Sequence, residues 1–305
     1  MKFKKNISLK NYTTFQIGGK AKYFSVVRNK EELVSAIKFA KEKRLPFFIL
    51  GQGSNLLVSD KGFKGIVIKI ENCKVKIENC KVVAGAGVLL SRLVNSSAER
   101  GLTGLGWAAG IPGTVGGAVY GNAGAFGKSM KDVIGQVEVL DVKDLGTELR
   151  SSGAKVKKKM KSSSPFKTYN LRKCNFGYKG SVFKKKKNLI IISAELKLKK
   201  GNKKEIKSRI KEYLNYKKTT QPLNFPSAGS IFKNYKKFFA GELIEKCNLK
   251  GKKIGKAKIS EKHANFIVNL DGAQAKDVKK LIKLIKKEVK NKFRVVLKEE
   301  IEFLS

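Results

Sequence analysis

The chain has 305 residues, 41% of them hydrophobic, and its 67 lysines and arginines against 24 aspartates and glutamates give a formal net charge of +43. This length suffices for two or three domains with buried cores. The sequence has neither a signal-peptide pattern nor an apolar run of the roughly 18 to 20 residues that span a membrane. We therefore predict a cytoplasmic protein. Four cysteines without CxxC spacing and one histidine, His263, argue against a Cys/His metal centre and against a Ser/His/Asp triad.

The pattern of the first hundred residues predicts alternating strands and helices. The segment 21–27 is a predicted strand, and 31–44 is a predicted helix with Leu33, Ile37 and Ala40 on one face. Further strands are predicted at 46–50, 65–70, 74–77 and 81–87, and a second helix at 89–101.

The alternation continues after one long polar interruption. The segment 145–165 is rich in lysine and is predicted to be a loop. Strands are predicted at 136–142, 174–183, 189–199, 264–270 and 294–304, and helices at 204–216, 241–247 and 275–293. This order of elements predicts an α/β or α+β chain.

A short loop, GQGSN, directly follows the predicted strand that ends at Leu50. Successive backbone N–H groups in such a loop can form a nest for phosphate oxygens, and here they come from Gly51, Gly53, Ser54 and Asn55. The loop is not the GxGxxG fingerprint, because a leucine occupies the last position, and no GxxxxGK[ST] pattern occurs. A plain tight turn therefore explains this loop about as well as a phosphate site does.

A second glycine-rich segment, GWAAGIPGTVGGAVYGNAGAFG at 106–127, holds eight glycines in 22 residues and no charged side chain. Apolar residues interleave with these glycines, so the segment can pack, unlike a flexible linker. Glycines in such a setting indicate that something approaches the main chain closely. We predict a second phosphate-binding loop made of Ile111, Pro112, Gly113, Thr114, Gly116 and Gly117. Two such nests together suit a pyrophosphate.

Four long motifs carry a family resemblance: GQGSNLLV, GLTGLGWAAGIPGTVGGAVYGNAGAFG, PSAGSIFKN and ISEKHANFIVN. Over most of the chain they resemble the UDP-N-acetylenolpyruvoylglucosamine reductases, flavoenzymes of peptidoglycan precursor synthesis, and the short chain favours the type II form. The resemblance implies an α+β fold with a two-lobed FAD-binding domain of the p-cresol methylhydroxylase/vanillyl-alcohol oxidase (PCMH/VAO) type at 1–200, with lobes of about 1–72 and 73–200. It also implies a C-terminal α+β substrate-binding domain at 201–305, whose last strand can pack back on the first lobe.

The resemblance implies a reaction and three catalytic residues. NADPH would reduce FAD, and UDP-N-acetylglucosamine enolpyruvate would be reduced to UDP-N-acetylmuramate. Ser230 in PSAGSIFKN matches the family's proton donor, and Glu300 matches its catalytic glutamate, with Glu299 as the register alternative. Lys179 in YKGSVF stands where the family has an arginine, YRxSxF, against the charge that develops on the substrate. Because lysine keeps the charge but lacks the planar fork that suits a carboxylate, we expect weakened catalysis.

Further site residues follow from the resemblance alone. The expected substrate contacts are Tyr178, Lys218, Asn234 and Asn265, and Lys250 is the expected contact for an NADPH phosphate. For His263, a structural role in the HANF turn is at least as favoured as a catalytic one. The segment IGGK, 17–20, has no His or Cys for a covalent flavin link, so FAD is predicted to be dissociable.

Two other functions remain open from the residues. Another PCMH-fold FAD oxidoreductase would use the same glycine loops, although PSAGSIFKN and Glu300 count against it. A non-enzymatic protein that binds nucleic acid or a membrane would explain the charge directly. Because lysines run through almost every segment, we weigh a compositional origin of the charge about two to one over a functional basic face. We expect a monomer with no specific nucleic-acid partner.

Overall fold

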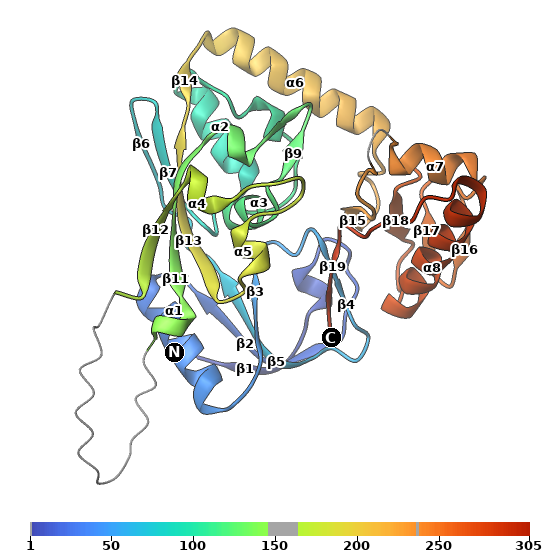
Figure 1. Ribbon diagram of the computed structural model, residues 1–305, viewed down its shortest axis with the longest axis horizontal. Helices are drawn as coiled ribbons and strands as arrows, with labels where there is room; N and C mark the ends of the chain where they lie inside the picture. Colours follow the sequence, from blue (N-terminus) through green and yellow to red (C-terminus); the bar gives the residue numbers. More distant parts are fainter. Residues whose placement is uncertain (1, 146–163, 236–237) are drawn as a thin grey trace.

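Two lobes, each built on its own sheet, form the N-terminal part of the molecule (Figure 1). The computed structural model describes residues 2–145, 164–235 and 238–305, so nearly all of the predicted loop at 145–165 lies outside the described residues. One hydrophobic core runs through both lobes, and a second core belongs mainly to the C-terminal part.

The first lobe is a four-stranded sheet in the order β1-β2-β5-β3. Its strands are β1 (Lys4–Ser8), β2 (Lys20–Val27), β5 (Phe63–Ile70) and β3 (Phe47–Leu50). β5 lies between β2 and β3 and is parallel to both. Helix α1 (Lys30–Glu42) connects β2 to β3, starts where the side chain of Asn29 accepts a hydrogen bond from Glu32 N, and buries the predicted apolar face.

The second lobe is a five-stranded antiparallel sheet in the order β12-β11-β13-β7-β6. Its strands are β12 (Phe166–Asn170), β11 (Ile134–Asp141), β13 (Leu189–Lys197), β7 (Lys81–Gly85) and β6 (Val75–Glu78). Helices α2 (Leu90–Glu99) and α3 (Val115–Gly121) pack their buried side chains into the same core. This lobe therefore places the glycine-rich segment 106–127 beside the sheet.

Helix α6 (Lys203–Thr220) leads from the second lobe to the C-terminal part along one edge of the molecule (Figure 1). The sheet there has the order β15-β18-β17-β16. Its elements are β15 (Ser227–Ser230), β18 (Phe266–Asn269), β17 (Ala257–Ile259) and β16 (Lys253–Ile254), with helices α7 (Ala240–Lys246) and α8 (Ala275–Phe293) packed on it.

The end of the chain returns to the first lobe. Strand β19 (Glu302–Leu304) pairs in parallel with β4 (Leu56–Val58), which directly follows the GQGSN loop. Asp60 of the first lobe also accepts hydrogen bonds from the N–H groups of Ala275 (2.7 Å) and Lys276 (3.0 Å), and so caps α8. These contacts hold the C-terminal part against the loop expected to bind the cofactor.

The remaining elements are short. They are η1 (Lys10–Tyr12), β8 (Leu102–Thr103), η2 (Gly106–Ala108), β9 (Gly124–Ala125), β10 (Lys128–Ser129), η3 (Met130–Asp132), η4 (Val142–Asp144), α4 (Leu171–Cys174), α5 (Val182–Lys185) and β14 (Lys199–Lys200). Within the described part of the chain, no helix combines the length and the apolar character that crossing a membrane requires.

The predicted α+β class is confirmed, but one predicted strand is wrong and another is shorter than predicted. The segment 174–183 is a tight turn between the one-turn helices α4 and α5, because two glycines and capping side chains of Asn170 and Ser181 outweigh its apolar residues. In the segment 294–304 only β19 is a strand, and the residues before it form single bridges and loop contacts.

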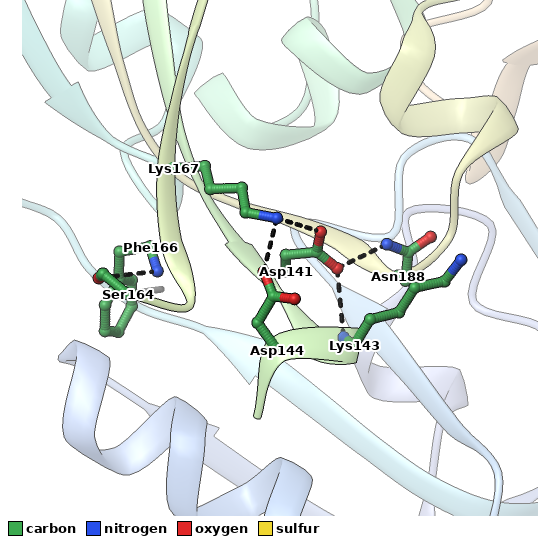
Figure 2. Close-up of polar contacts among 7 residues, drawn as sticks. All are labelled: Asp141, Lys143, Asp144, Ser164, Phe166, Lys167 and Asn188. Atoms are coloured by element: carbon green, nitrogen blue, oxygen red, sulfur yellow. Dashed lines mark hydrogen bonds and ion pairs between the residues drawn. The ribbon is translucent and has the colours of Figure 1, made fainter. Parts of the chain in front are cut away.

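A polar cluster closes the end of β11 (Figure 2). The Lys167 ammonium lies 2.9 Å from Asp141 Oδ2 and 2.5 Å from Asp144 Oδ2. Asn188 Nδ2 and Lys143 N donate to Asp141 Oδ1 at 2.7 Å and 3.2 Å. Burial by itself raises the pKa of Asp141, but these bonds outweigh it and hold that pKa below its ordinary value.

Replacing Lys167 by Met should lower the urea midpoint of unfolding at neutral pH, because two partly buried carboxylates lose their shared cation. A folded-state pKa below the unfolded value gives stability above the unfolded pKa that disappears as the pH falls through the folded pKa, so the deficit should shrink below about pH 4. The control is Lys76→Met, whose exposed ion pair with Glu78 should contribute little. Equal midpoints for Lys167→Met and the unmodified chain at pH 7 would contradict the prediction.

Candidate functional site

The two glycine loops contact each other. Ser54 Oγ donates to the carbonyl oxygen of Pro112 at 2.9 Å. A Cβ atom on Gly51 would lie 2.6 Å from Thr114 Oγ1, and one on Gly113 would lie 3.0 Å from Ser54 Oγ. Side chains at these glycines would therefore push the two loops apart. The predicted convergence of one loop from each lobe is what the structure has.

The glycines of the second loop divide into two groups. Gly113 lies in irregular backbone at a φ of +134°, which favours glycine. Gly116 and Gly117, predicted as loop residues, are instead in the first turn of α3. Their N–H groups already donate to Ala86 O (2.9 Å) and Thr114 Oγ1 (3.4 Å), and a Cβ atom on Gly116 would lie 2.8 Å from that of Ala86. Gly116 thus packs α3 closely on the sheet, and the candidate phosphate nest narrows to residues 51–55 and 111–114.

A second group of predicted residues meets at a turn that we call the GYKG hairpin, Gly177–Gly180. Gly177 and Gly180 exchange both backbone hydrogen bonds, at 3.0 Å and 3.3 Å, and leave Tyr178 and Lys179 at the tip. Lys179 has a φ of +52°, a left-handed conformation that is unusual for a lysine. From this position its ammonium lies 2.7 Å from Glu300 Oε1, and only 24% and 18% of the two side chains are exposed.

Glu300 joins the other parts of the site through its backbone. Its N–H donates to Ile231 O at 2.8 Å, directly after Ser230 on β15. Its carbonyl oxygen accepts a hydrogen bond from Asn55 Nδ2 at 3.1 Å. Glu300 therefore bonds the predicted cation, the GQGSN loop and the residue that follows the predicted proton donor. The register alternative Glu299 points elsewhere, to Lys286 of α8 at 2.8 Å.

The tip of the hairpin also reaches the C-terminal part through Tyr178. Its hydroxyl accepts a hydrogen bond from Asn234 N at 3.2 Å, although 63% of this side chain is exposed. The side chain of Asn234 accepts a hydrogen bond at 3.0 Å from the N–H of Ala240, the first residue of α7. Two of the predicted substrate contacts, Tyr178 and Asn234, therefore lie next to each other.

Asn265 is placed differently from the prediction of a substrate contact. It is buried, and both ends of its amide bond Phe232: Oδ1 accepts from Phe232 N at 2.9 Å and Nδ2 donates to Phe232 O at 2.8 Å. His263 Nδ1 accepts from Asn265 N at 3.2 Å, and burial lowers the pKa of the imidazole. Asn265 thus joins the segment after β15 to the start of β18, and His263 bonds within its own turn, as the structural one of its two considered roles requires.

The two remaining predicted cations lie farther out. Lys218 lines a cavity of about 750 Å³ between the segment 221–225 and strands β17 and β18. Lys250 pairs with Glu245 at 2.6 Å. Neither contact links these lysines to the Lys179–Glu300 pair.

The neighbour of Lys218 is a residue that the sequence prediction missed. Lys217 is only 5% exposed, its Nζ donates to Ala109 O at 2.6 Å, and it lies 5.8 Å from the ring centre of Phe126. Burial lowers its pKa to about 8. The spacing of Ile206, Ile210, Tyr213 and Lys217 on one helical face could have indicated that Lys217, and not Lys218, points inward.

Comparison with known proteins agrees with this geometry. Residues 21–151 match the family model of an FAD binding domain, and residues 221–304 match that of the UDP-N-acetylenolpyruvoylglucosamine reductase C-terminal domain. The UDP-N-acetylenolpyruvoylglucosamine reductase of Caldanaerobacter subterraneus subsp. tengcongensis is 40% identical over 300 residues, with 98% of this chain and 92% of that protein covered. That of Caldicellulosiruptor saccharolyticus is 43% identical over 309 residues, with 100% and 92% covered.

This chain belongs to the UDP-N-acetylenolpyruvoylglucosamine reductase family. A crystal structure of the reductase from Thermus caldophilus superposes with a TM-score of 0.80 at 36% identity and covers 100% of both chains. The predicted family, the FAD-binding domain and the C-terminal domain are thereby confirmed. The FAD-binding match includes both glycine loops, where the close packing of bare backbone fits a flavin nucleotide.

Replacing Gly51 by Ala should weaken FAD retention, because the new Cβ atom would collide with Thr114 Oγ1 and separate the loops of this reductase family member. The measurement is the flavin-to-protein absorbance ratio after gel filtration, together with FAD titration of the apoprotein. Gly121→Ala is the matched control, because a Cβ atom there has nothing within 4 Å. Equal FAD affinity for Gly51→Ala and Gly121→Ala would contradict the prediction.

Lys217 should make stability depend on pH. Because its folded pKa of about 8 is below the unfolded value, the unfolded chain binds more protons between about pH 8 and pH 10.5, and stability rises with pH through this window. Relative to Lys217→Met, the unmodified chain should gain roughly 2–3 kcal/mol between pH 7 and pH 10.5. Urea unfolding at both pH values measures the difference. Lys218→Met, which changes the adjacent exposed lysine, should show no such pH-dependent difference.

Proposed function

We propose that this chain catalyses the NADPH-dependent reduction of UDP-N-acetylglucosamine enolpyruvate to UDP-N-acetylmuramate, with Lys179, Ser230 and Glu300 as its catalytic residues. Family membership over the full length supports the reaction and the use of FAD and NADPH. A cytoplasmic location and a monomeric state stay predictions of the sequence.

Two loops would hold the FAD, Gly51–Asn55 and Ile111–Thr114. Neither loop has an acidic side chain, and Gly51, Gly53 and Gly113 leave backbone uncovered. In the second loop the N–H groups come from Gly113 and Thr114, because Pro112 has none and Ile111 N donates to Ala108 O at 3.1 Å. The contact between Ser54 and Pro112 fixes one loop against the other. Bound FAD, once reduced by NADPH, supplies the hydride that adds to the enolpyruvyl double bond. The hydrogen bond from Asn55 to Glu300 supports a cofactor site beside the proposed catalytic residues.

Lys179 would stabilise the negative charge that builds up beside the substrate carboxylate when hydride adds to the double bond. An ammonium has three N–H donors, so the ion pair with Glu300 leaves others that can reach a carboxylate. Glu300 thereby orients the cation. Because the pair is largely shielded from water, its electrostatic effect on a neighbouring anion is stronger than at an exposed site.

Ser230 would deliver the proton that completes the reduction. It ends β15, and the carbonyl oxygen of the next residue, Ile231, accepts a hydrogen bond from Glu300 N, so the backbone brings Ser230 near the Lys179–Glu300 pair. A serine hydroxyl is a weak acid, and the charge that develops on the substrate carbon drives the transfer. Hydride and proton together convert the double bond to a single bond.

Substrate recognition would use residues around this pair. Tyr178 and Asn234 meet beside it, and Lys218 lines a cavity wide enough for part of a nucleotide sugar. Lys250 is proposed to contact an NADPH phosphate. Asn265 is not proposed as a substrate contact, because it is 4% exposed and one donor and one acceptor position of its amide already bond Phe232.

The observation that carries the proposal is that Glu300 bonds Lys179, the GQGSN loop and Ile231, the residue that follows Ser230. The test is anaerobic stopped-flow spectroscopy of the FAD-loaded protein, first with NADPH and then with UDP-N-acetylglucosamine enolpyruvate. Bleaching of the flavin band followed by its recovery is expected. Bleaching without recovery would indicate another acceptor, and the absence of bound flavin would overturn the proposal.

Lys179→Met should slow the recovery of the flavin band by roughly 10²–10³-fold, because it removes a cation placed on developing charge. Lys179→Arg should raise the rate above that of the unmodified chain, because the guanidinium donates two hydrogen bonds to a carboxylate. Both variants keep a side chain that can occupy the same turn, so FAD content serves as the control. A Lys179→Met protein with an unchanged recovery rate would show that Lys179 has no catalytic role.

A further inference from the structure

One buried side chain of the second lobe, that of Asn122, bonds the base of the GYKG hairpin. Asn122 follows α3 and is 5% exposed. Its Nδ2 donates to the carbonyl oxygen of Gly177 at 2.9 Å, and its Oδ1 accepts a hydrogen bond from Lys131 N at 3.0 Å. Both ends of this amide are therefore bonded, one of them to the first residue of the hairpin.

The backbone at Asn122 is left-handed, with φ of 45° and ψ of 56°, at the C-terminal cap of a helix. Glycine is the residue that such a cap favours most, and asparagine is tolerated. The surrounding segment 106–127 contains eight glycines, yet this position has a side chain. The two hydrogen bonds of that side chain give a physical reason for asparagine here.

The hairpin depends on such support, because its own geometry is costly. Lys179 occupies the left-handed region, where a lysine is unfavourable, and the backbone of the two-residue tip is closed by the Gly177–Gly180 pair. A second anchor acts at its far end, where Ser181 Oγ donates to Tyr120 O at 2.7 Å. Asn122 and Ser181 thus fix the two ends of the hairpin to one segment of the second lobe, and the tip projects toward Glu300.

We propose that Asn122 is a positioning residue for the reductase reaction. Its hydrogen bond to the Gly177 carbonyl fixes the position of the hairpin relative to the second lobe, and thereby the position of the Lys179 ammonium relative to Glu300. This inference rests on the proposed role of Lys179. A displacement of about 1 Å in a catalytic group can lower a rate by about a hundredfold, so a single lost anchor is enough to matter.

The informative variant is Asn122→Gly, because glycine keeps the left-handed backbone and removes both side-chain bonds. We expect the recovery of the flavin band with UDP-N-acetylglucosamine enolpyruvate to slow by about tenfold to a hundredfold. Bleaching by NADPH and FAD content should be unchanged, because Asn122 contacts neither glycine-loop nest in the described structure. Unchanged recovery, or equal slowing of both half-reactions, would overturn the inference.

Asn175→Gly is the matched control. Asn175 also caps a helix, α4, in the left-handed conformation, with φ of 44° and ψ of 53°, but it is exposed and its side chain does not bond the hairpin. Asn122→Asp is a second variant that keeps an acceptor for Lys131 N and removes the donor to Gly177 O. It should slow recovery as Asn122→Gly does, and a rate close to that of the unmodified chain would overturn the inference.

A double-mutant cycle separates positioning from a general loss of structure. If Asn122 acts through Lys179, then Asn122→Gly should cause no further slowing in a Lys179→Met background. Equal factors in both backgrounds would overturn the inference while leaving the proposed function intact. If Lys179→Met alone does not slow recovery, the proposed role of Lys179 itself fails.

Discussion

The parallel pairing of β19 with β4 is the constraint on which the site depends. It brings the last residues of the chain next to the loop that follows β3, and Glu300 comes to lie between Asn55 and Ile231. Through this pairing Glu300 bonds both Lys179 of the second lobe and Ile231, which follows Ser230 in the C-terminal part. Capping of α8 by Asp60 reinforces the same contact from the other side.

The few acidic residues of this basic chain have particular weight at the site. Glu300 pairs with Lys179, and two residues later Glu302 of β19 pairs with Lys184 at 2.6 Å, so the end of the chain meets the segment around the hairpin through two ion pairs. Burial, and to a smaller extent the charge of Glu302, raises the pKa of Tyr120 to about 12. The hydroxyl of Tyr120 therefore stays neutral beside the two ion pairs. Its backbone carbonyl oxygen accepts the hydrogen bond from Ser181 Oγ.

The glycines of the two loops serve tertiary contact as much as ligand access. Gly51 and Gly113 let the lobes touch at Thr114 and Ser54, and Gly116 lets α3 approach Ala86. A flavin nucleotide at this junction would meet backbone from both lobes, which ties cofactor binding to the packing of one lobe on the other. Within this glycine-rich segment, Asn122 has a side chain that bonds the carbonyl oxygen of Gly177.

The sequence by itself determined the family, the two glycine loops, the α+β class and nearly every long element, because long motifs and the periodicity of apolar residues are local properties. The motif match alone did not show that Lys217, and not Lys218, points into the protein, because that choice depends on which face of α6 is buried. Nor could it show that the side-chain amides of Asn265 and Asn122 bond backbone groups far away in the sequence. The prediction of a strand at 174–183 was wrong, because the glycines and the helix-capping side chains outweigh the apolar composition over so short a segment. Only the tertiary structure decided that Glu300 and not Glu299 meets Lys179, since that choice depends on the register of the returning chain against the first lobe.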